Sequence, residues 1–381
     1  MNVLLTSAGR RSYLVRFFKE ALRGRGQVIA CDCSKSAPAL AEADCHFLVP
    51  PTDAPAYLDV LLSICRSQEV RLVLAVNDLE LPDLAREASR FHAVGTMPVV
   101  SSPQLIATCQ DKWAAFRWLR ERGIATPETY LSLDDARQAL AGGALDFPLL
   151  LKPRCGSSSV GVERVETERE LALAYEWGQV QLRRGVLSRL SPAGTDNSLV
   201  IQQWHRGQEY GLDVVNDLQG VYRATLARRK LAMRAGNTDR AMTVADPALE
   251  QLGRDLGNRL QHVGCLDCDV LATDSGYLVL DLNPRLGGGY PFSHLAGANV
   301  PAALVAWAGG QEADSSWLRA EPYVVVSKYD SVTIMSRGVL DPRAIRHPEV
   351  VPLLLRESPQ VVSVADGPAA VTDCQGRSRE S

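Results

Sequence analysis

Apolar and amphipathic stretches alternate regularly over the first hundred residues of the chain. Three apolar runs predict buried strands, and three stretches with apolar residues at helical spacing predict helices. The predicted strands are residues 2–5, 27–31 and 71–75, and the predicted helices are residues 12–22, 56–67 and 81–90. This order is typical of a parallel sheet, in which ligands bind at the carboxyl ends of the strands. The polar residues 77–80, which follow the third strand, are interpreted either as ligand contacts or as the cap of the next helix.

Helix start signals organise the next part of the chain. Asp111 begins a predicted helix that ends at Gly123, and Thr167 with Glu170 forms a capping box for another helix. Ser101, Ser102 and Pro103 mark the start of an earlier helix, and we place a domain boundary at residues 103–109.

The stretch YLVLDLNPRLGGG at residues 277–289 has the strongest pattern in the sequence. Val279, Asp281 and Asn283 are spaced by two, so on a strand they are expected to share one face. Arg285 and three glycines follow. A strand end that carries a carboxylate, an amide oxygen and then a guanidinium suits hard cations and phosphate oxygens.

The preceding segment predicts a partner for that strand. Residues 265–271 read as a strand, and residues 274–276 read as a hairpin turn. Folding the hairpin brings Asp269 towards Asp281. Two acids and Asn283 on adjacent strands predict an oxygen-only site for Mg²⁺ that bridges nucleotide phosphates.

A lysine and a small-residue loop form a second candidate site. Residues 148–153 predict a buried strand that carries Lys152, which must reach an anion or extend to solvent. Ser157, Ser158 and Ser159 lie in the glycine–serine loop that follows. Such a loop can close its backbone N–H groups over phosphates, although for the loop alone an ordinary hairpin linker is the better interpretation.

Residues 199–215 predict two strands around a turn, and residues 222–230 predict a further strand that ends in a basic cluster. A basic cluster is usually a solvated face, but beside a phosphate site Lys230 could neutralise charge on a transferred phosphoryl group. Residues 234–239 read as a polar loop. Further on, residues 291–307 read as largely helical and residues 323–329 as a strand.

Composition and charge exclude several classes of protein. The chain has 381 residues, 46% of them hydrophobic, 22% charged, and a formal net charge of −3. These values predict a soluble globular protein of two or three domains with no general affinity for nucleic acid or membrane. The sequence has no apolar stretch long enough to span a bilayer and no signal-peptide pattern, so a cytoplasmic location is expected. Nine cysteines, an odd number, favour reduced thiols. Cys265 and Cys268 are expected on opposite strand faces, which argues against a zinc site.

Four of these motifs occur in the order that ATP-grasp enzymes use, and the chain resembles that superfamily over residues 100–310. The motifs are Lys112, Lys152 with its loop, Gln202 to Glu209, and Asp269 to Arg285. In the superfamily the first of the two metal-binding residues is often Glu or Gln, and the second is usually Glu. The NPRLGGGYPF run most resembles stand-alone relatives of the carbamoyl-phosphate synthase large chain.

The resemblance implies an α/β protein with an α+β ATP-grasp fold. It implies a parallel-sheet pre-ATP-grasp domain at residues 1–105 and a two-lobed ATP-grasp domain at residues 106–315, with lobes at 106–198 and 199–315. Residues 316–381 would form a strand-containing extension and tail. A homodimer is a superfamily expectation.

The resemblance also implies roles for residues. Phosphates, adenine and ribose would be bound by Lys112, Lys152, Ser157, Ser158, Ser159, Gln202, Gln203, Trp204 and Glu209. Two Mg²⁺, or Mn²⁺, would be held by Asp269, Asp281 and Asn283, with Arg285 and Lys230 as catalytic residues.

The expected activity is ATP-dependent ligation of a small-molecule carboxylate to an amine, with amino acids as the first candidates, through an acyl phosphate that releases ADP and phosphate. The alternatives are a nucleotide-binding protein without ligase activity, or a kinase or carboxylase of the same fold. The sequence identifies neither substrate.

Overall fold

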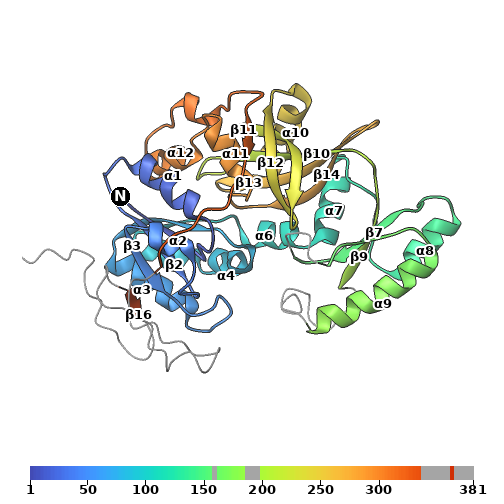
Figure 1. Cartoon of the computed structure of the whole chain (residues 1–381), viewed down its shortest axis with the longest axis horizontal. Coiled ribbons are helices and arrows are strands. Elements are labelled where there is room, and N and C mark those ends of the chain that lie inside the picture. Colours follow the sequence, from blue (N-terminus) through green and yellow to red (C-terminus); the bar gives the residue numbers. More distant parts are fainter. Residues whose placement is uncertain (157–160, 185–197, 336–360, 364–381) are drawn as a thin grey trace, which may run out of the picture. The chain divides into compact units, whose positions relative to one another are not determined.

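The computed structural model describes residues 1–156, 161–184, 198–335 and 361–363. These residues form two compact units, which are coloured along the sequence in Figure 1. The first unit comprises residues 1–99, residues 308–310 and the described residues from 329 on; the second comprises residues 100–307 and 311–328. The domain limits expected at residues 105 and 315 stay predictions.

The first unit is a six-stranded sheet in the order β16-β3-β2-β1-β4-β5, and every neighbouring pair is parallel. All five residues of β2 are buried, as expected for a parallel sheet covered on both faces. Its elements are β1 (Asn2–Thr6), α1 (Ser12–Leu22), β2 (Val28–Asp32), α2 (Pro38–Glu42), β3 (Cys45–Leu48), α3 (Tyr57–Ser67), β4 (Val70–Ala75), a 3₁₀ turn (Asp78–Glu80), α4 (Leu81–Arg86), α5 (Ala88–Ala93), β5 (Met97–Val99) and β16 (Val361–Ser363).

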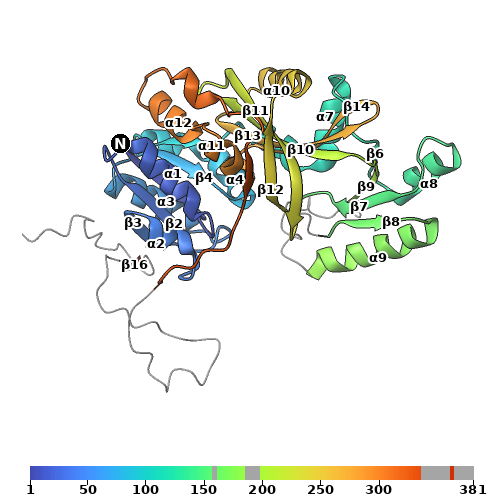
Figure 2. The ribbon, with the colours of Figure 1, turned by 45° about the horizontal axis from the view of Figure 1, so that its top comes forward.

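The second unit contains two antiparallel sheets, which Figure 2 shows from a second direction. The six-stranded sheet has the order β14-β13-β10-β11-β12-β15, and the four-stranded sheet has the order β6-β9-β7-β8. Its elements are α6 (Pro103–Gln110), α7 (Lys112–Glu121), β6 (Thr129–Tyr130), α8 (Leu133–Ala141), β7 (Leu149–Pro153), β8 (Glu163–Val165), α9 (Glu168–Arg184), β9 (Leu199–Gln203), β10 (Gln208–Asn216), β11 (Tyr222–Arg234), β12 (Asn237–Val244), α10 (Pro247–Leu260), β13 (Cys265–Thr273), β14 (Gly276–Asn283), α11 (Tyr290–Leu295), α12 (Val300–Ala308), a 3₁₀ turn (Ser315–Leu318) and β15 (Val325–Ser327).

Each sheet of the second unit has one apolar face covered by helices. Leu266, Cys268 and Val270 of β13 pack with residues of α6, α7 and α10 in one core. Leu149 and Leu151 of β7 pack with residues of α8 and α9 in another core. Because side chains alternate along a strand, the residues between these apolar positions point to the opposite face.

Helix capping explains two of the expected starts. The carboxylate of Asp111 accepts hydrogen bonds from the backbone N–H groups of Trp113 and Ala114 at the start of α7. The hydroxyl of Thr167 accepts from the N–H of Glu170 at the start of α9. Asn77 accepts from the N–H of Leu79, so the cap interpretation of residues 77–80 is confirmed for this side chain.

Several expected elements differ in the structure. The helix expected at residues 81–90 is two helices, α4 and α5, separated at Glu87. The loop expected at residues 234–239 is a two-residue turn between β11 and β12, with Ala235 and Gly236 both at positive φ, as in a type I′ hairpin. The expected helix at 291–307 is divided into α11 and α12, and the expected strand at 323–329 is only Val325–Ser327.

The cysteines only partly match the expectation of reduced thiols. Seven cysteines of the described chain are free, including Cys265 and Cys268, but Cys45 is disulfide-bonded. Cys268 packs in the core of the six-stranded sheet. Cys265 is three residues away, on the other face of β13, so the two do not form a metal-ligand pair.

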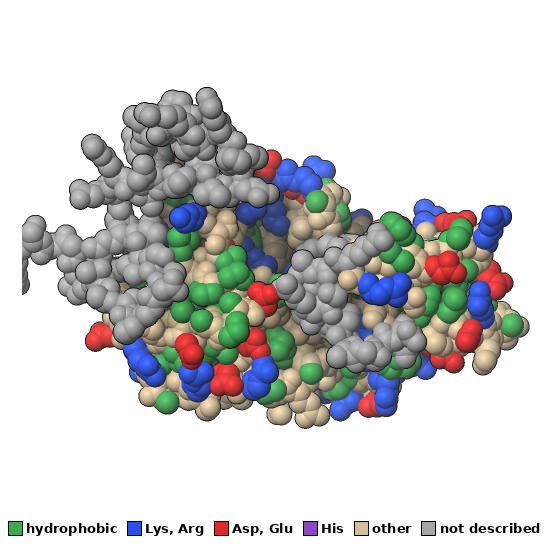
Figure 3. Space-filling view, turned by 90° about the horizontal axis from the view of Figure 1, so that it is seen from below, with side chains coloured by type: hydrophobic (Ala, Val, Ile, Leu, Met, Phe, Trp, Pro, Cys, Tyr) green, Lys and Arg blue, Asp and Glu red, His purple; other side chains and the backbone are tan. Residues whose placement is uncertain are grey.

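The face shown in Figure 3 carries basic and acidic side chains interspersed among apolar and polar ones. This mixture matches the near balance of 41 Lys and Arg with 44 Asp and Glu residues in the sequence.

Candidate active site

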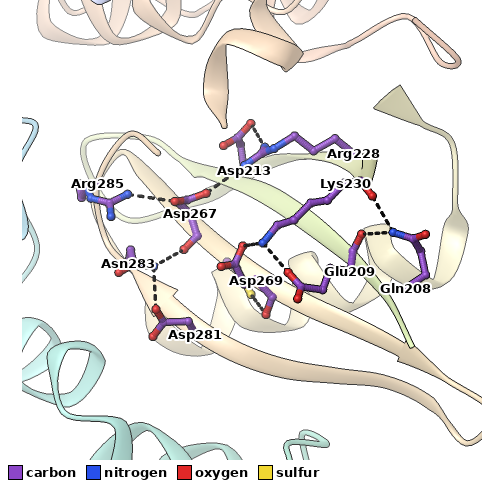
Figure 4. A network of polar contacts seen from close by, with 11 residues as sticks. Gln208, Glu209, Asp213, Arg228, Lys230, Asp267, Asp269, Asp281, Asn283 and Arg285 are labelled. Carbon is purple, nitrogen blue, oxygen red and sulfur yellow. Dashed lines mark hydrogen bonds and ion pairs between the residues drawn. The ribbon is translucent and has the colours of Figure 1, made fainter. Parts of the chain in front are cut away.

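The β13–β14 hairpin places two carboxylates directly opposite each other. Asp269 pairs with Asp281, and Asp267 pairs with Asn283. Cross-strand partners share a face of the sheet, so these side chains project together from one side of the hairpin (Figure 4). The prediction that Asp269 and Asp281 meet across the hairpin is confirmed.

Val279 does not share that face, contrary to expectation. The register shifts between Asp269 and Val270, so that Val270 pairs with Val279 while Asp269 pairs with Asp281. This β-bulge adds one residue to β14 and reverses the alternation at that point. As a result Val279 and Leu282 both lie in the apolar core, although they are three residues apart.

The hairpin supplies the oxygen donors that a hard divalent cation requires. The amide nitrogen of Asn283 donates to Oδ2 of Asp281 at 3.4 Å. Burial raises the pKa of Asp269, Lys230 opposes that rise, and the nearby charges of Asp267 and Asp281 add to it. Within the part of the chain that the structure describes, no group of three His, Cys, Asp or Glu side chains could hold a metal ion. The candidate set instead combines two carboxylates with one amide oxygen, and its chemistry fits Mg²⁺.

Lys230 of β11 lies beside this hairpin and bridges two strands. Its Nζ is 2.8 Å from Oδ1 of Asp269 and 3.0 Å from Oε2 of Glu209 (Figure 4). Burial lowers the pKa of Lys230, but the two carboxylates outweigh burial and raise it above its ordinary value. Lys230 is therefore a fixed positive charge next to the acidic pair.

Three charged residues behind the carboxylate pair, Asp213, Arg228 and Asp267, were not identified from the sequence as functional. Arg228 is only 1% exposed, and its guanidinium contacts Asp213 at 2.5 Å and Asp267 at 3.0 Å. Asp267 also contacts Arg285 at 3.0 Å. A signal was present: Asp267 and Arg228 each lie two residues before a predicted site residue on the same strand, and hence on the same face.

The four-stranded sheet contributes Lys152. This lysine is 8% exposed, and its Nζ donates to Oε1 of Gln202 at 2.8 Å. The amide nitrogen of Gln202 donates to the hydroxyl of Thr129 at 2.9 Å, which fixes the amide so that its oxygen faces the lysine. The oxygen expected to contact adenine is thus already bonded to Lys152, although a carbonyl can accept a second hydrogen bond.

Charged residues of both sheets of the second unit affect the pKa of Lys152. Burial, and after it the positive charge of Lys112, lower the pKa of Lys152 to about 8. Asp281 and Asp269 act in the opposite direction. A lysine of one sheet is therefore close enough to the acidic pair of the other sheet to sense its charge.

Lys112 lies at the start of α7, beside the strand that carries Lys152. Its Nζ donates to the backbone carbonyl of Gly156 at 2.6 Å. Asp111 joins the same two segments through an ion pair with Arg154 at 2.6 Å. The expected phosphate-binding residues Ser157, Ser158 and Ser159 lie outside the described residues.

The segment expected to contact the base and ribose runs from the end of β9 to the start of β10. The side chain of Gln203 exchanges two hydrogen bonds with the backbone of Asp146, at 3.0 and 2.9 Å. The backbone N–H of Trp204 donates to Pro148, and the guanidinium of Arg164 lies 4.2 Å from the centre of the Trp204 ring. Glu209 remains 44% exposed while it pairs with Lys230, so its carboxylate is accessible.

Two family models match the chain. The model described as "PylC-like, N-terminal domain" matches residues 3–100, and the model described as "ATP-grasp in the biosynthetic pathway with Ter operon" matches residues 195–330. D-alanine–D-alanine ligase of Halorhodospira halophila is 31% identical over 107 residues, which are 28% of this chain and 30% of that protein. The resistance protein VanA of Enterococcus faecium is 25% identical over 209 residues, 50% of this chain and 56% of that protein. The chain thus spans about a third to a half of the length of such relatives.

Solved structures share the fold over most of the chain. The biotin carboxylase domain of 2-oxoglutarate carboxylase from Hydrogenobacter thermophilus superposes with a TM-score of 0.67 at 16% identity, covering 85% of this chain and 73% of that one. L-amino acid ligase from Bacillus licheniformis gives a TM-score of 0.60 at 18% identity, covering 80% and 74%.

No helix among the described residues is both long and apolar enough to cross a membrane. The order of the strands, the converging lysines and acids, and the matching family models agree with one another. The chain has the ATP-grasp fold, and its residues 195–330 match an ATP-grasp family model.

Proposed function

We propose that the chain is an ATP-dependent carboxylate–amine ligase. The γ-phosphoryl group of ATP is transferred to a substrate carboxylate, which gives an acyl phosphate and ADP. The nitrogen of an amine then attacks the carbonyl carbon, phosphate leaves, and the amine loses a proton as the amide forms. The observation that supports the proposal is the pairing of Asp269 with Asp281 across the β13–β14 hairpin, together with the action of both charges on the buried Lys152 of the other sheet.

The remaining roles are proposed from the resemblance to ATP-grasp enzymes. Lys112 and Lys152 bind phosphates, together with the loop that contains Ser157, Ser158 and Ser159. Gln202, Gln203 and Trp204 surround the adenine, and Glu209 binds the ribose. The ammonium group of Lys152 donates a hydrogen bond to the neutral amide oxygen of Gln202. A phosphate of the bound nucleotide would give this buried cation an anionic partner.

Asp269, Asp281 and Asn283 would hold the magnesium ions, two of them by superfamily precedent, and Mn²⁺ could replace Mg²⁺ there. When bound, these ions neutralise charge on the phosphates and on the transferred group. Lys230 contacts Asp269 of the acidic pair, and Arg285 contacts Asp267, two residues before Asp269 on the same strand. Both would add fixed positive charge where two anions, a carboxylate and a triphosphate, must approach each other.

The substrates are proposed by class. Several relatives are, by name, ligases of amino acids. We therefore expect the carboxylate and the amine to be amino acids or similar small molecules. A homodimer is also proposed, and light scattering of the purified chain measures it directly.

The test is a panel of amino acids and dipeptides with ATP and Mg²⁺, monitored for ADP release and analysed by mass spectrometry. The expected result is ADP release that requires both a carboxylate and an amine, with a product heavier than the acid by the mass of the amine minus water. The variant with both Asp269→Ala and Asp281→Ala is the control and should release no ADP.

Other results point to other functions. Tight nucleotide binding without ADP release from any pair indicates a binding protein. A phosphorylated product indicates a kinase, and a product that has gained bicarbonate carbon indicates a carboxylase. Any of these results overturns the ligase proposal.

A further inference from the structure

Four charged side chains form a continuous row behind the candidate cation site. We refer to Asp213, Arg228, Asp267 and Arg285 as the buried charge row. Its contacts run from Asp213 to Arg228 at 2.5 Å, from Arg228 to Asp267 at 3.0 Å, and from Asp267 to Arg285 at 3.0 Å (Figure 4). Ser293 of α11 adds a hydrogen bond to Asp213 at 2.6 Å.

Asp267 differs from the other two acids on its face of the hairpin. Its Oδ1 contacts Arg228 and its Oδ2 contacts Arg285, so both oxygens are engaged by guanidinium groups. Asp269 instead forms an ion pair with Lys230 through Oδ1. Because each oxygen of Asp267 already has a cationic partner, this carboxylate suits the orientation of arginines better than the binding of a metal.

The glycines after Arg285 pack against this row. A Cβ atom built on Gly287 would overlap the carboxylate of Asp267, and one built on Gly289 would overlap the guanidinium of Arg228. The backbone can therefore approach the charges only because these residues lack side chains. The row fixes the course of the chain directly after Arg285, at the same time as it contacts the Arg285 side chain.

We propose that Asp267 is a positioning residue, which holds the guanidinium of Arg285 in place to contact the terminal phosphate of the bound nucleotide. The inference rests on the proposed function for the role of Arg285. A positioning role is expected because an arginine guanidinium must be oriented to contact phosphate oxygens in the planar, bidentate way. Asp267 and, through Arg228, Asp213 supply that orientation.

The test is a double-mutant cycle in nucleotide binding, measured by calorimetry with Mg²⁺ on the full chain. Arg285→Ala, Asp267→Asn and the double variant are each titrated with ADP and with a non-hydrolysable ATP analogue. Asp267→Asn is expected to weaken the analogue about tenfold while ADP affinity changes less than about twofold. The double variant should bind the analogue no more weakly than Arg285→Ala alone.

A merely structural role gives a different result. Asp267→Asn would then weaken both nucleotides alike, or the losses in the two single variants would multiply in the double variant. Either result overturns the proposal.

Two neighbouring glycines provide a second test in case Asp267→Asn does not fold. Gly287→Ala displaces the carboxylate of Asp267 without removing its charge, whereas a Cβ on Gly288 meets its nearest atom, Oδ1 of Asn237, at an ordinary 3.7 Å. Gly287→Ala should lose analogue affinity selectively, and Gly288→Ala should not. Equal effects of the two variants would overturn the proposal.

The binding measurements separate this inference from the proposed function. If no substrate pair supports ADP release, the ligase proposal fails, while the cycle still shows whether Asp267 acts through Arg285. If ligation is observed but the cycle is additive, only the positioning role fails.

Discussion

Lys152 and Lys230 are two lysines of equal burial in two different sheets. Each is 8% exposed. Lys152 has the neutral amide of Gln202 as its hydrogen-bond partner, and its pKa falls to about 8. Lys230 contacts the carboxylates of Asp269 and Glu209, and its pKa rises above the ordinary value. The partner therefore decides the direction of the shift, because burial acts the same way on both.

The difference between these regions has a functional meaning. The six-stranded sheet has its own counter-charges, so Lys230 is held in place before any ligand arrives. In the four-stranded sheet Lys152 is short of negative charge, and the phosphates of a nucleotide would supply it. On the proposed function, one region is organised in advance, while the other would be completed by binding.

The largest effect is expected from removing a carboxylate of the organised region. Asp269→Asn removes a proposed metal ligand and one partner of Lys230, so ADP release should fall by about 10³-fold. The matched control is Glu209→Gln, which removes the other, more exposed partner of Lys230 and should mainly raise the KM for ATP. If both variants lose turnover equally, the two carboxylates do not have separate roles.

Replacing the two lysines by methionine should change stability in opposite directions. Lys230→Met leaves two carboxylates without their cation and should lower the free energy of unfolding by about 2 kcal/mol. Lys152→Met removes a cation whose burial, from the depression of its pKa from 10.5 to about 8, costs about 3 kcal/mol at neutral pH, so stability should rise. Urea unfolding without nucleotide measures both. A loss of stability in both variants would contradict the comparison.

The stability contributed through Lys152 should depend on pH. Between pH 8 and the ordinary lysine pKa of 10.5, the unfolded chain binds more protons at this site than the folded chain, so the free energy of unfolding rises with pH across that window. Below pH 8 the lysine is charged in both the folded and the unfolded chain, so the free-energy cost of burying the charge is present in full and does not vary with pH. The measurement is the difference in unfolding free energy between the parent chain and Lys152→Met at several pH values, and a difference that does not vary from pH 8 to 10 would refute it.

The smallest effect is expected from making the two regions alike. Gln202→Glu gives Lys152 a carboxylate partner, which should raise its pKa as Asp269 and Glu209 raise that of Lys230. At pH 8.5 the parent chain should take up a proton when ATP binds, whereas Gln202→Glu should take up almost none. Calorimetry in buffers of different ionisation enthalpy detects that proton, and the KM for ATP should change by less than about threefold.

Local patterns were enough to predict most elements of the fold. The predicted helix at residues 12–22 coincides with α1 because its apolar spacing and its flanking polar residues act within a few turns of chain. The β13–β14 hairpin was also predictable, since its turn residues and alternating positions are local. Strand β12 was missed because its polar residues read as a loop, and only pairing with β11 and β15 makes it a strand.

The sequence by itself determined the candidates for the proposed chemistry: Asp269, Asp281, Asn283, Lys152 and Lys230 stand out by residue type and spacing. Tertiary structure decided which partners they contact. The bulge that moves Val279 into the core, the amide that fixes Lys152 and the buried charge row around Asp267 all depend on strands distant in sequence. The physical reason is that pKa values and ion pairs depend on the distance between charges in space, which one-dimensional spacing within a single strand does not contain.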